Sequence, residues 1–242
     1  MTGALFLYIL QYDKKVRQQM LISECVQVQP ETDPNICIIW LHGLGANGHD
    51  FEPIVPHLEI DEGIRPWFVF PNAPKIRVTI NNSITMPAWY DIFEMNINRK
   101  ADIKGINESI NSIGMLIDQI KVKITTKNIV LAGFSQGGVI AYGAGISYNS
   151  KLAGILGLST YFPKDLKLEH HPSNQKTEVF ICHGRYDEIV PVALGKEAKH
   201  YFEENGHKVQ YTEYDMEHQV IPLQCKEIGD WINSLFSVYK TT

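Results

Sequence analysis

The chain has 242 residues, of which 44% are apolar and 20% charged, and its formal net charge is −5 with acidic and basic residues interspersed. This length is typical of one large α/β domain, and the absence of a basic cluster argues against a nucleic-acid partner. No CxxC pair is present, so we expect free thiols in a cytoplasmic protein instead of a disulfide framework or zinc site. The cysteines are Cys25, Cys37, Cys182 and Cys225.

The beginning of the chain does not fit the pattern of the remainder. The apolar run at residues 4–10 is too short to span a bilayer. It also lacks the basic residues before it and the small-residue cleavage site after it that mark a signal peptide. Met20 offers a second start, and a recognisable domain pattern begins there. We therefore predict an N-terminal extension at residues 1–19, a single domain at residues 20–242, and no integral membrane segment.

Short apolar runs rich in β-branched residues alternate with helical patterns along the chain, which is typical of βα units. Residues 36–41 are apolar throughout, as expected for a strand buried on both faces. Residues 209–214 alternate and are expected nearer an edge, and residues 21–28 are expected to add an antiparallel strand. Further strands are predicted at residues 67–70, 129–132, 154–158 and 179–182.

Helical periodicity fills the intervals between these strands. Five isoleucines between residues 106 and 120 recur at steps of four and three, which places them on one buried helix face. The last helix has a similar face at residues 228–235. These patterns predict an α/β fold with a mostly parallel central sheet and helices on both faces. Ligands of such sheets bind outside the carboxyl ends of the strands.

The strongest chemical signal is the sequence Gly133-Phe134-Ser135-Gln136-Gly137, between the strand at residues 129–132 and a helical stretch at residues 139–147. A serine on a sharp strand-to-helix turn exposes its hydroxyl, but side chains two residues before and after it would collide. Glycine at both places removes the clash. We therefore predict Ser135 as a nucleophile, the alternative being a tight turn without chemistry.

A serine hydroxyl needs an adjacent base, and in this arrangement the acid follows the nucleophile along the chain and precedes the histidine. Asp187 lies in the loop after the strand at residues 179–182 and is the predicted acid. Its neighbour Glu188 is the alternative that sequence alone leaves open. Asp165 and Asp215 lie in less suitable contexts.

The histidine is expected in a loop between the next strand and the last helix, and His218 occupies that place. We predict it to be the general base. His42 and His183 each precede a glycine at a strand end and are interpreted as loop-shaping residues. The histidines expected to be solvated are His170, His171, His200 and His207.

An acyl-transfer site also needs N–H donors for the oxyanion of its tetrahedral intermediate. The backbone N–H of Gln136, directly after the nucleophile, is one candidate. The second is Leu44 in the loop His42-Gly43-Leu44-Gly45, which follows an early strand. The alternatives are a plain turn and a phosphate cradle, and the loop lacks the glycine patterns that mark phosphate cradles. With no HExxH or CxxC spacing, we expect neither a metal nor another cofactor.

Seven short motifs occur along the chain: WLHGLG at 40–45, PNAP at 71–74, MPAWYD at 86–91, GFSQGG at 133–138, LSTY at 158–161, HGxxD at 183–187 and YxMxH at 214–218. Together they resemble one known family, the carboxylesterase/phospholipase family of α/β hydrolases, which includes acyl-protein thioesterases and lysophospholipases. The resemblance implies cofactor-free hydrolysis of carboxylic esters or thioesters. It also implies a triad of Ser135, Asp187 and His218, with Leu44 and Gln136 as oxyanion donors. Gln219 departs from the family, which usually has serine after the histidine.

Residues 77–88 alternate around a turn-like segment at residues 81–83 and are predicted to form a small hairpin. In the family that the chain resembles, this stretch forms a flap that helps to bind the acyl chain. We therefore predict that Ile84, Met86 and Trp89 present apolar surface to the acyl group. The alternative is a surface hairpin over ordinary core.

The predicted substrate is a small ester or an acylated lipid or protein, and the enzyme is expected to be a monomer or homodimer. Two other functions remain open at this point. One is a catalytically silent binding protein on a hydrolase scaffold, which the intact order of Ser135, Asp187 and His218 disfavours. The other is a peptidase or lactone hydrolase, because the triad forms an acyl-enzyme from an amide as well as from an ester.

Overall fold

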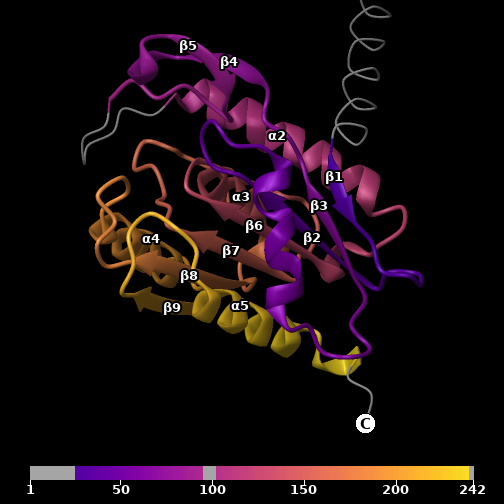
Figure 1. Ribbon diagram of the computed structural model, residues 1–242. Coiled ribbons are helices and arrows are strands. Elements are labelled where there is room, and N and C mark those ends of the chain that lie inside the picture. The colour runs from indigo at the N-terminus through magenta and orange to yellow at the C-terminus, as the bar shows by residue number, and fades with distance from the viewer. Residues whose placement is uncertain (1–24, 95–101, 240–242) are drawn as a thin grey trace, which may run out of the picture.

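The computed structural model describes residues 25–94 and 102–239 (Figure 1). Its main sheet has seven strands in the order β1-β3-β2-β6-β7-β8-β9. β1 pairs antiparallel with β3, and the other neighbouring strands are parallel. The predicted strands, including the edge position of residues 209–214, are therefore confirmed, except that residues 21–24 of the strand expected at 21–28 lie outside the described residues. Their bounds are Val26–Val28 (β1), Ile36–Leu41 (β2), Pro66–Phe70 (β3), Ile129–Phe134 (β6), Gly154–Leu158 (β7), Glu178–Gly184 (β8) and Val209–Tyr214 (β9).

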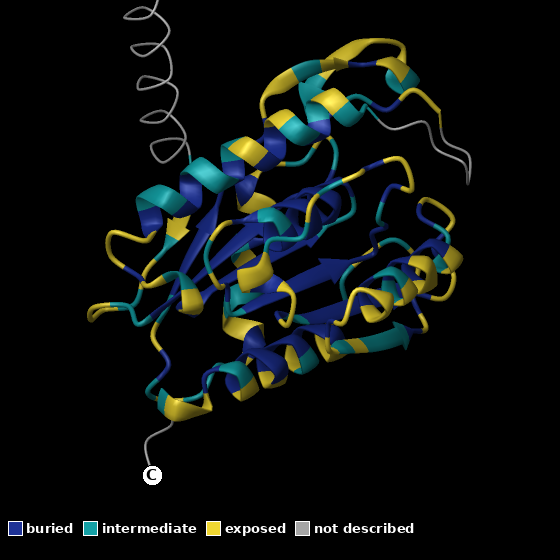
Figure 2. Ribbon diagram, turned by 180° about the vertical axis from the view of Figure 1, so that it is seen from behind, coloured by how far each residue is buried: buried dark blue, intermediate teal, exposed yellow. Residues whose placement is uncertain are grey.

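Helices cover both faces of this sheet, as predicted (Figure 2). The inner strands are almost wholly buried, whereas the edge strands β1 and β9 are partly exposed. One face packs against α2, α3 and α4, and the other against α5 and the 3₁₀ helix η2. The layers follow from the alternation along each strand, since neighbouring residues point to opposite faces. The helix bounds are Ile103–Ile120 (α2), Gln136–Ser147 (α3), Val192–Glu204 (α4), Pro222–Leu235 (α5) and Glu52–Leu58 (η2).

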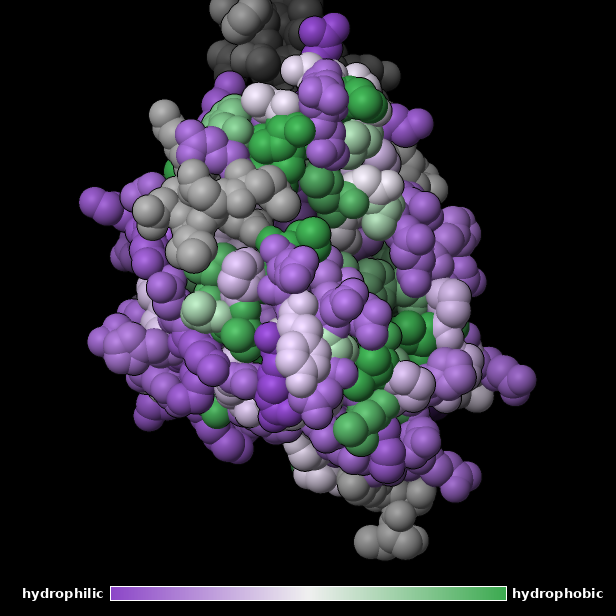
Figure 3. Space-filling view, turned by 60° about the vertical axis from the view of Figure 1, so that its left-hand side comes forward, coloured by the Kyte–Doolittle hydropathy of each residue, from purple (hydrophilic) through white to green (hydrophobic). Residues whose placement is uncertain are grey.

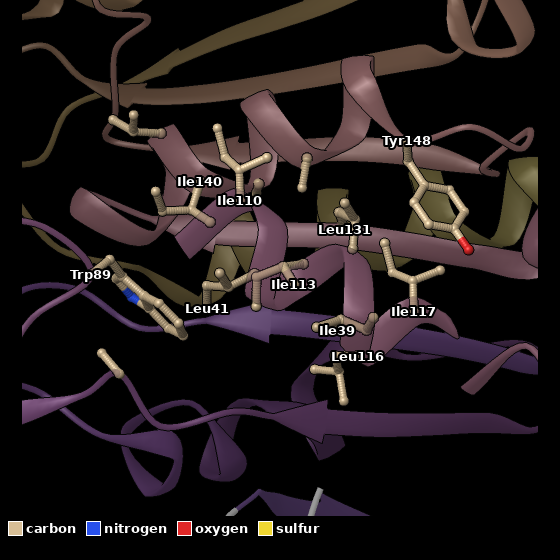
Figure 4. Close-up of a cluster of buried hydrophobic side chains, with 14 of the residues drawn as sticks. Ile39, Leu41, Trp89, Ile110, Ile113, Leu116, Ile117, Leu131, Ile140 and Tyr148 are labelled. Atoms are coloured by element: carbon tan, nitrogen blue, oxygen red, sulfur yellow. The ribbon is translucent and has the colours of Figure 1, made fainter. Parts of the chain in front are cut away.

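The isoleucine stripe forms the buried face of α2. The helix begins after Asp102, whose carboxylate accepts the N–H of Gly105 at 3.0 Å and so caps the first turn. Ile113 and Ile117 lie in a cluster with Ile39 and Leu131 from the underlying strands (Figure 4). The amphipathic pattern is thus explained by packing on the sheet.

A hairpin stands apart from the main sheet, beside α2 (Figure 1). Its strands β4 (Lys75–Val78) and β5 (Ile84–Pro87) pair antiparallel, so the predicted hairpin is confirmed. Ile80 lies in the 3₁₀ turn η3 (Thr79–Asn81) and not in a strand. The Gly45 N–H donates to the Pro87 carbonyl at 2.8 Å and so joins the base of the hairpin to the loop after β2.

The expectations for His207 and for the N-terminal extension have different outcomes. His207, expected to be solvated, is only 5% exposed, and its Nδ1 lies 2.9 Å from the Thr177 carbonyl oxygen. The predicted extension at residues 1–19 lies outside the described residues. Within the described part of the chain, no helix has the length and apolar character needed to cross a membrane.

The packing of α2 predicts a large difference between two identical substitutions. Ile113→Ala removes a fully buried side chain from the cluster against β2 and is expected to lower the free energy of unfolding by about 2–5 kcal/mol. Ile84→Ala, at a side chain that is 58% exposed, is expected to change it by less than about 0.5 kcal/mol. Urea titrations of both variants measure the difference, and equal costs would contradict this assignment of core and surface.

Candidate active site

Ser135 stands between the end of β6 and the first residue of α3, in a backbone conformation that side-chain-bearing residues rarely adopt. Its φ is 54° and its ψ is −119°, which stores strain that the surrounding structure must hold in place. The Ser135 N–H donates to the Leu158 carbonyl at 2.9 Å, and the Thr160 hydroxyl donates to the Ser135 carbonyl at 2.7 Å. Bonds from β7 and the residues after it thus hold the turn on both sides.

The flanking glycines are required by close packing, as the sequence predicts. A Cβ at Gly133 would lie 2.4 Å from the Gly137 carbonyl oxygen, and a Cβ at Gly137 would lie 2.5 Å from the His42 carbonyl oxygen. A Cβ at Gly138 would lie 2.5 Å from the Thr160 side chain. The turn therefore brings α3 into backbone contact with the end of β2, which no larger residue permits at these positions.

The structure brings together the three side chains selected as a triad. His218 Nε2 lies 2.9 Å from Ser135 Oγ, and His218 Nδ1 lies 2.7 Å from Asp187 Oδ2. The other carboxylate oxygen, Asp187 Oδ1, accepts the N–H groups of Ile189 at 2.9 Å and Val190 at 2.7 Å. Glu188, the alternative acid, is exposed. Geometry therefore favours Asp187 as the partner of His218.

Asp187 is buried, yet its environment favours the charged form. Burial by itself would raise the pKa of the carboxyl group. The hydrogen bonds from His218 and from the Val190 N–H outweigh that effect and hold the pKa of Asp187 below its ordinary value. The carboxylate is therefore ionised near neutral pH, where it can stabilise an imidazolium at His218.

The two proposed oxyanion donors lie beside the serine. A Cβ at Gly43 would be 3.5 Å from Ser135 Cβ, so the loop after β2 passes directly over the nucleophile. Leu44 and Gln136 both line the same cavity as Ser135. The Gln136 side chain is held by residues 89 and 90, through bonds of 2.9 and 2.7 Å. Its backbone N–H is one of the first in α3, which have no acceptor within the helix.

A cavity of about 620 Å³ opens at Ser135 and His218. It lies at the carboxyl ends of the strands, on the side that Figure 3 brings forward, where hydrophobic patches interrupt a mainly hydrophilic surface. Gln219, the departure from the family pattern, is exposed and lines this cavity. The apolar residues that line the cavity are Leu44, Ala46, Phe51, Ile54, Ile80, Ile92, Phe134, Ile189 and Val220.

The residues predicted to contact the acyl group are placed differently from that prediction. Ile84 is 58% exposed at the far end of the hairpin, Met86 accepts a bond from Asn81 at its sulfur, and Trp89 is 3% exposed. The Trp89 indole N–H donates to the His42 carbonyl at 2.9 Å, so this residue supports the loop over the nucleophile. None of the three is among the cavity-lining residues.

The same segment supplies other residues to the cavity wall: Ile80, Asn81, Tyr90 and Ile92. The chain leaves the strand ladder at the 3₁₀ turn, which carries Ile80 to the cavity while Ile84 remains on the outer surface. The alternation of Val78 and Ile80 was the available signal for Ile80. No local sequence signal identified Phe51, Ile54 or Val220, which belong to other loops.

Within residues 25–94 and 102–239, no three His, Cys, Asp or Glu side chains gather as a metal site. The four cysteines, all of which lie in described segments, are free thiols. His42 and His183 are buried, and burial lowers the pKa of both below the ordinary histidine value. Both contact backbone groups of neighbouring loops.

Comparison with solved structures finds the same fold. SOBER1 of Arabidopsis thaliana has a TM-score of 0.79 at 28% identity, over 83% of this chain and 99% of that one. Acyl-protein thioesterase 2 of Zea mays has a TM-score of 0.77 over 87% of this chain and 98% of that one. Its 23% identity supports likeness of fold alone. The α/β-hydrolase fold is thus confirmed.

Sequence comparison identifies the family. The phospholipase/carboxylesterase family model matches residues 23–236. Acyl-protein thioesterase 1 of Saccharomyces cerevisiae is 34% identical over 211 residues, covering 83% of this chain and 92% of the relative. The protein of the same name in Schizosaccharomyces pombe is 34% identical over 74% of this chain and 81% of its own length. The chain therefore belongs to the phospholipase/carboxylesterase family of α/β hydrolases and is a hydrolase of ester or thioester bonds.

Proposed function

We propose that the protein cleaves fatty-acyl esters or thioesters through an acyl-enzyme on Ser135, with His218 as general base and acid and Asp187 as the orienting carboxylate. The observation that carries this proposal is the continuous chain of contacts from Ser135 Oγ through both nitrogens of His218 to Asp187 Oδ2. The Ser135 end of this series of contacts lies in the cavity, where a substrate carbonyl can reach the hydroxyl.

The geometry supports a two-step reaction. His218 Nε2 accepts the hydroxyl proton as Ser135 Oγ attacks the carbonyl carbon, and it then protonates the departing alcohol or thiol. Water attacks the acyl-enzyme in the second step, with His218 again accepting and returning the proton. Asp187 holds Nδ1–H of the ring and stabilises the imidazolium. No metal or other cofactor is needed.

The backbone N–H groups of Leu44 and Gln136 are the proposed oxyanion donors. Both residues border the cavity at Ser135, and Gln136 is the first residue of α3. The positive end of the α3 dipole points toward the same place, which favours negative charge there. Such donors act in the transition state and cost little reorganisation when they are already fixed.

The apolar wall of the cavity supports an acyl chain as the bound group, and the relatives named acyl-protein thioesterase support an acylated protein as one substrate. An acylated lipid or small ester has the same reacting group. The complete triad geometry disfavours a silent binding protein. A peptidase or lactone hydrolase remains the second candidate, because the acyl-enzyme is common to all. We place the activity in the cytoplasm, where free thiols stay reduced.

The proposed triad predicts how substitutions change ester turnover. Ser135→Ala and His218→Ala are each expected to lower ester turnover by about 10⁴-fold or more, because the members act as a unit, and Asp187→Asn by a similar factor. Glu188→Gln, at the exposed neighbouring carboxylate, is the matched control and is expected to leave turnover unchanged. The assays use p-nitrophenyl octanoate and a palmitoyl thioester. Normal turnover by Ser135→Ala would exclude the assignment, and absence of both turnover and fluorophosphonate labelling of Ser135 in the native protein would favour the silent binder.

The apolar wall of the cavity predicts how turnover depends on the length of the acyl chain. Each buried methylene contributes up to about 0.8 kcal/mol, so kcat/KM is expected to rise several-fold per two carbons until the cavity fills. Ile80→Asp is expected to reduce turnover of an octanoyl ester far more than that of an acetyl ester, because Ile80 lines the cavity. Ile84→Asp, on the exposed side of the hairpin, is the control and should affect both esters little. Equal losses on both esters in Ile80→Asp would show that the hairpin is structural only.

The domain boundary forms part of the same proposal. The family match begins at residue 23, so we infer that residues 20–242 contain the whole catalytic domain. A chain that begins at Met20 is expected to fold and to hydrolyse esters at the rate of the full chain, as measured by circular dichroism and p-nitrophenyl ester assays. An insoluble or inactive product would show that residues 1–19 are part of the domain.

A further inference from the structure

A second imidazole, that of His183, lies next to Asp187 and takes no part in the catalytic steps. His183, near the end of β8, is fully buried. Its Nε2 lies 2.7 Å from the Val190 carbonyl oxygen and 3.7 Å from Asp187 Oδ2. Asp187 therefore faces two histidines, His218 at hydrogen-bond distance and His183 slightly farther away.

The protonation of His183 follows from this contact. A carbonyl oxygen only accepts, so Nε2 must carry the hydrogen and donate it to Val190. Burial lowers the pKa of His183, so the ring is neutral near pH 7 and its Nδ1 carries a lone pair. Among the described residues, Nδ1 has no hydrogen-bond partner. Among the described residues, the His183 side chain therefore makes its hydrogen bond through Nε2, to the Val190 carbonyl.

Val190 links this bond to the carboxylate. Its N–H donates to Asp187 Oδ1 at 2.7 Å, beside the N–H of Ile189 at 2.9 Å. His183 holds the carbonyl of the same residue. The turn at residues 187–190 is therefore fastened from two sides, which leaves Asp187 Oδ2 directed at His218 Nδ1. Release of the Val190 carbonyl would free the turn that aims the carboxylate.

The ring itself has little freedom to move. A Cβ at Gly195 would lie 2.3 Å from His183 Nδ1, so the backbone of α4 packs directly against the imidazole. The charged and titratable groups that act on it are Asp187 in the loop after β8, His218 in the loop after β9, and Glu213 on β9. On α4, Lys196 is paired with Glu213 at 3.0 Å.

We propose that His183 is a positioning residue for the triad acid, which acts by fixing the Val190 carbonyl and hence the direction of Asp187 Oδ2. This inference rests on the proposed function, since it takes Asp187 as the residue that orients His218. His183 itself touches neither the serine hydroxyl nor the cavity wall among the contacts described. Its effect on turnover passes through Asp187.

Two amide variants separate this role from simple filling of space. In His183→Gln the side-chain amide can reach the place of Nε2 and keep the bond to Val190, whereas the shorter side chain of His183→Asn reaches only the place of Nδ1. We expect His183→Asn to lower kcat by about 10²-fold, as for a catalytic group displaced by about 1 Å, with KM changed by less than about threefold. His183→Gln is expected to keep kcat within about fivefold of the native value.

The pH profile gives a readout that loss of stability would not produce. A displaced carboxylate stabilises the imidazolium of His218 less, so the acid limb of the kcat/KM profile should move to lower pH in His183→Asn and remain in place in His183→Gln. His207→Gln is the matched control, because His207 is also buried and bonds a backbone carbonyl, but before the amino end of β9 and away from the site. It is expected to lower Tm without changing kcat or the pH profile.

Proton NMR makes the test independent of turnover. The His218 Nδ1–H bonded to Asp187 should give a downfield resonance that weakens in His183→Asn and persists in His183→Gln. If the native enzyme hydrolyses no acyl ester or thioester, the proposed function fails, while this resonance still tests the role of His183. Gly195→Ala, which displaces the ring without removing it, should resemble His183→Asn. Equal kcat, pH profile and resonance in the Asn and Gln variants would overturn the inference.

Discussion

The site depends on one constraint, the backbone of Ser135 held in a conformation with φ at 54°. This conformation is costly for a residue with a side chain, so it persists only because its surroundings leave no alternative. Gly137 lies against the carbonyls of Leu41 and His42, and bonds from the Thr160 side chain and to Leu158 hold the turn from the other side. The strained turn exposes the hydroxyl, starts α3 at the next residue and brings the loop after β2 over the serine.

The acid and the histidine are fixed by a different means, because their loops are joined to each other. The Arg185 N–H donates to the Tyr214 carbonyl at 2.9 Å, and the Tyr186 N–H donates to the Met216 carbonyl at 3.1 Å. A Cβ at Gly184 would lie 2.4 Å from carbonyl oxygens of the opposite loop. The pairing of β8 and β9 thus continues into the two loops. The distance between Asp187 and His218 is therefore set by the register of β8 and β9, which cannot change without breaking backbone hydrogen bonds.

The sequence predicted the parts of this protein that local pattern and chain order determine. Apolar runs such as residues 36–41 identified buried strands, and the order of Ser135, Asp187 and His218 along the βα units selected three side chains that the structure brings together. The cavity wall was not predictable in this way. Phe51, Ile54 and Val220 meet there from loops far apart in sequence, and the periodicity of one segment does not encode which residues of another segment it meets.

Substitutions at different positions of the separate hairpin are expected to have unequal effects. β4 and β5 form their own two-stranded sheet, so their backbones make no strand pairing with the main sheet. The base at Pro87 is bonded to Gly45 in the loop over the nucleophile, whereas Ile84 at the far end is exposed. Tolerance to substitution should therefore be greater on the outer side of the hairpin, at Ile84, than at its base or at Ile80 on the cavity wall. Inherited variation can accumulate on that outer side without altering the reaction, while purifying selection preserves the base.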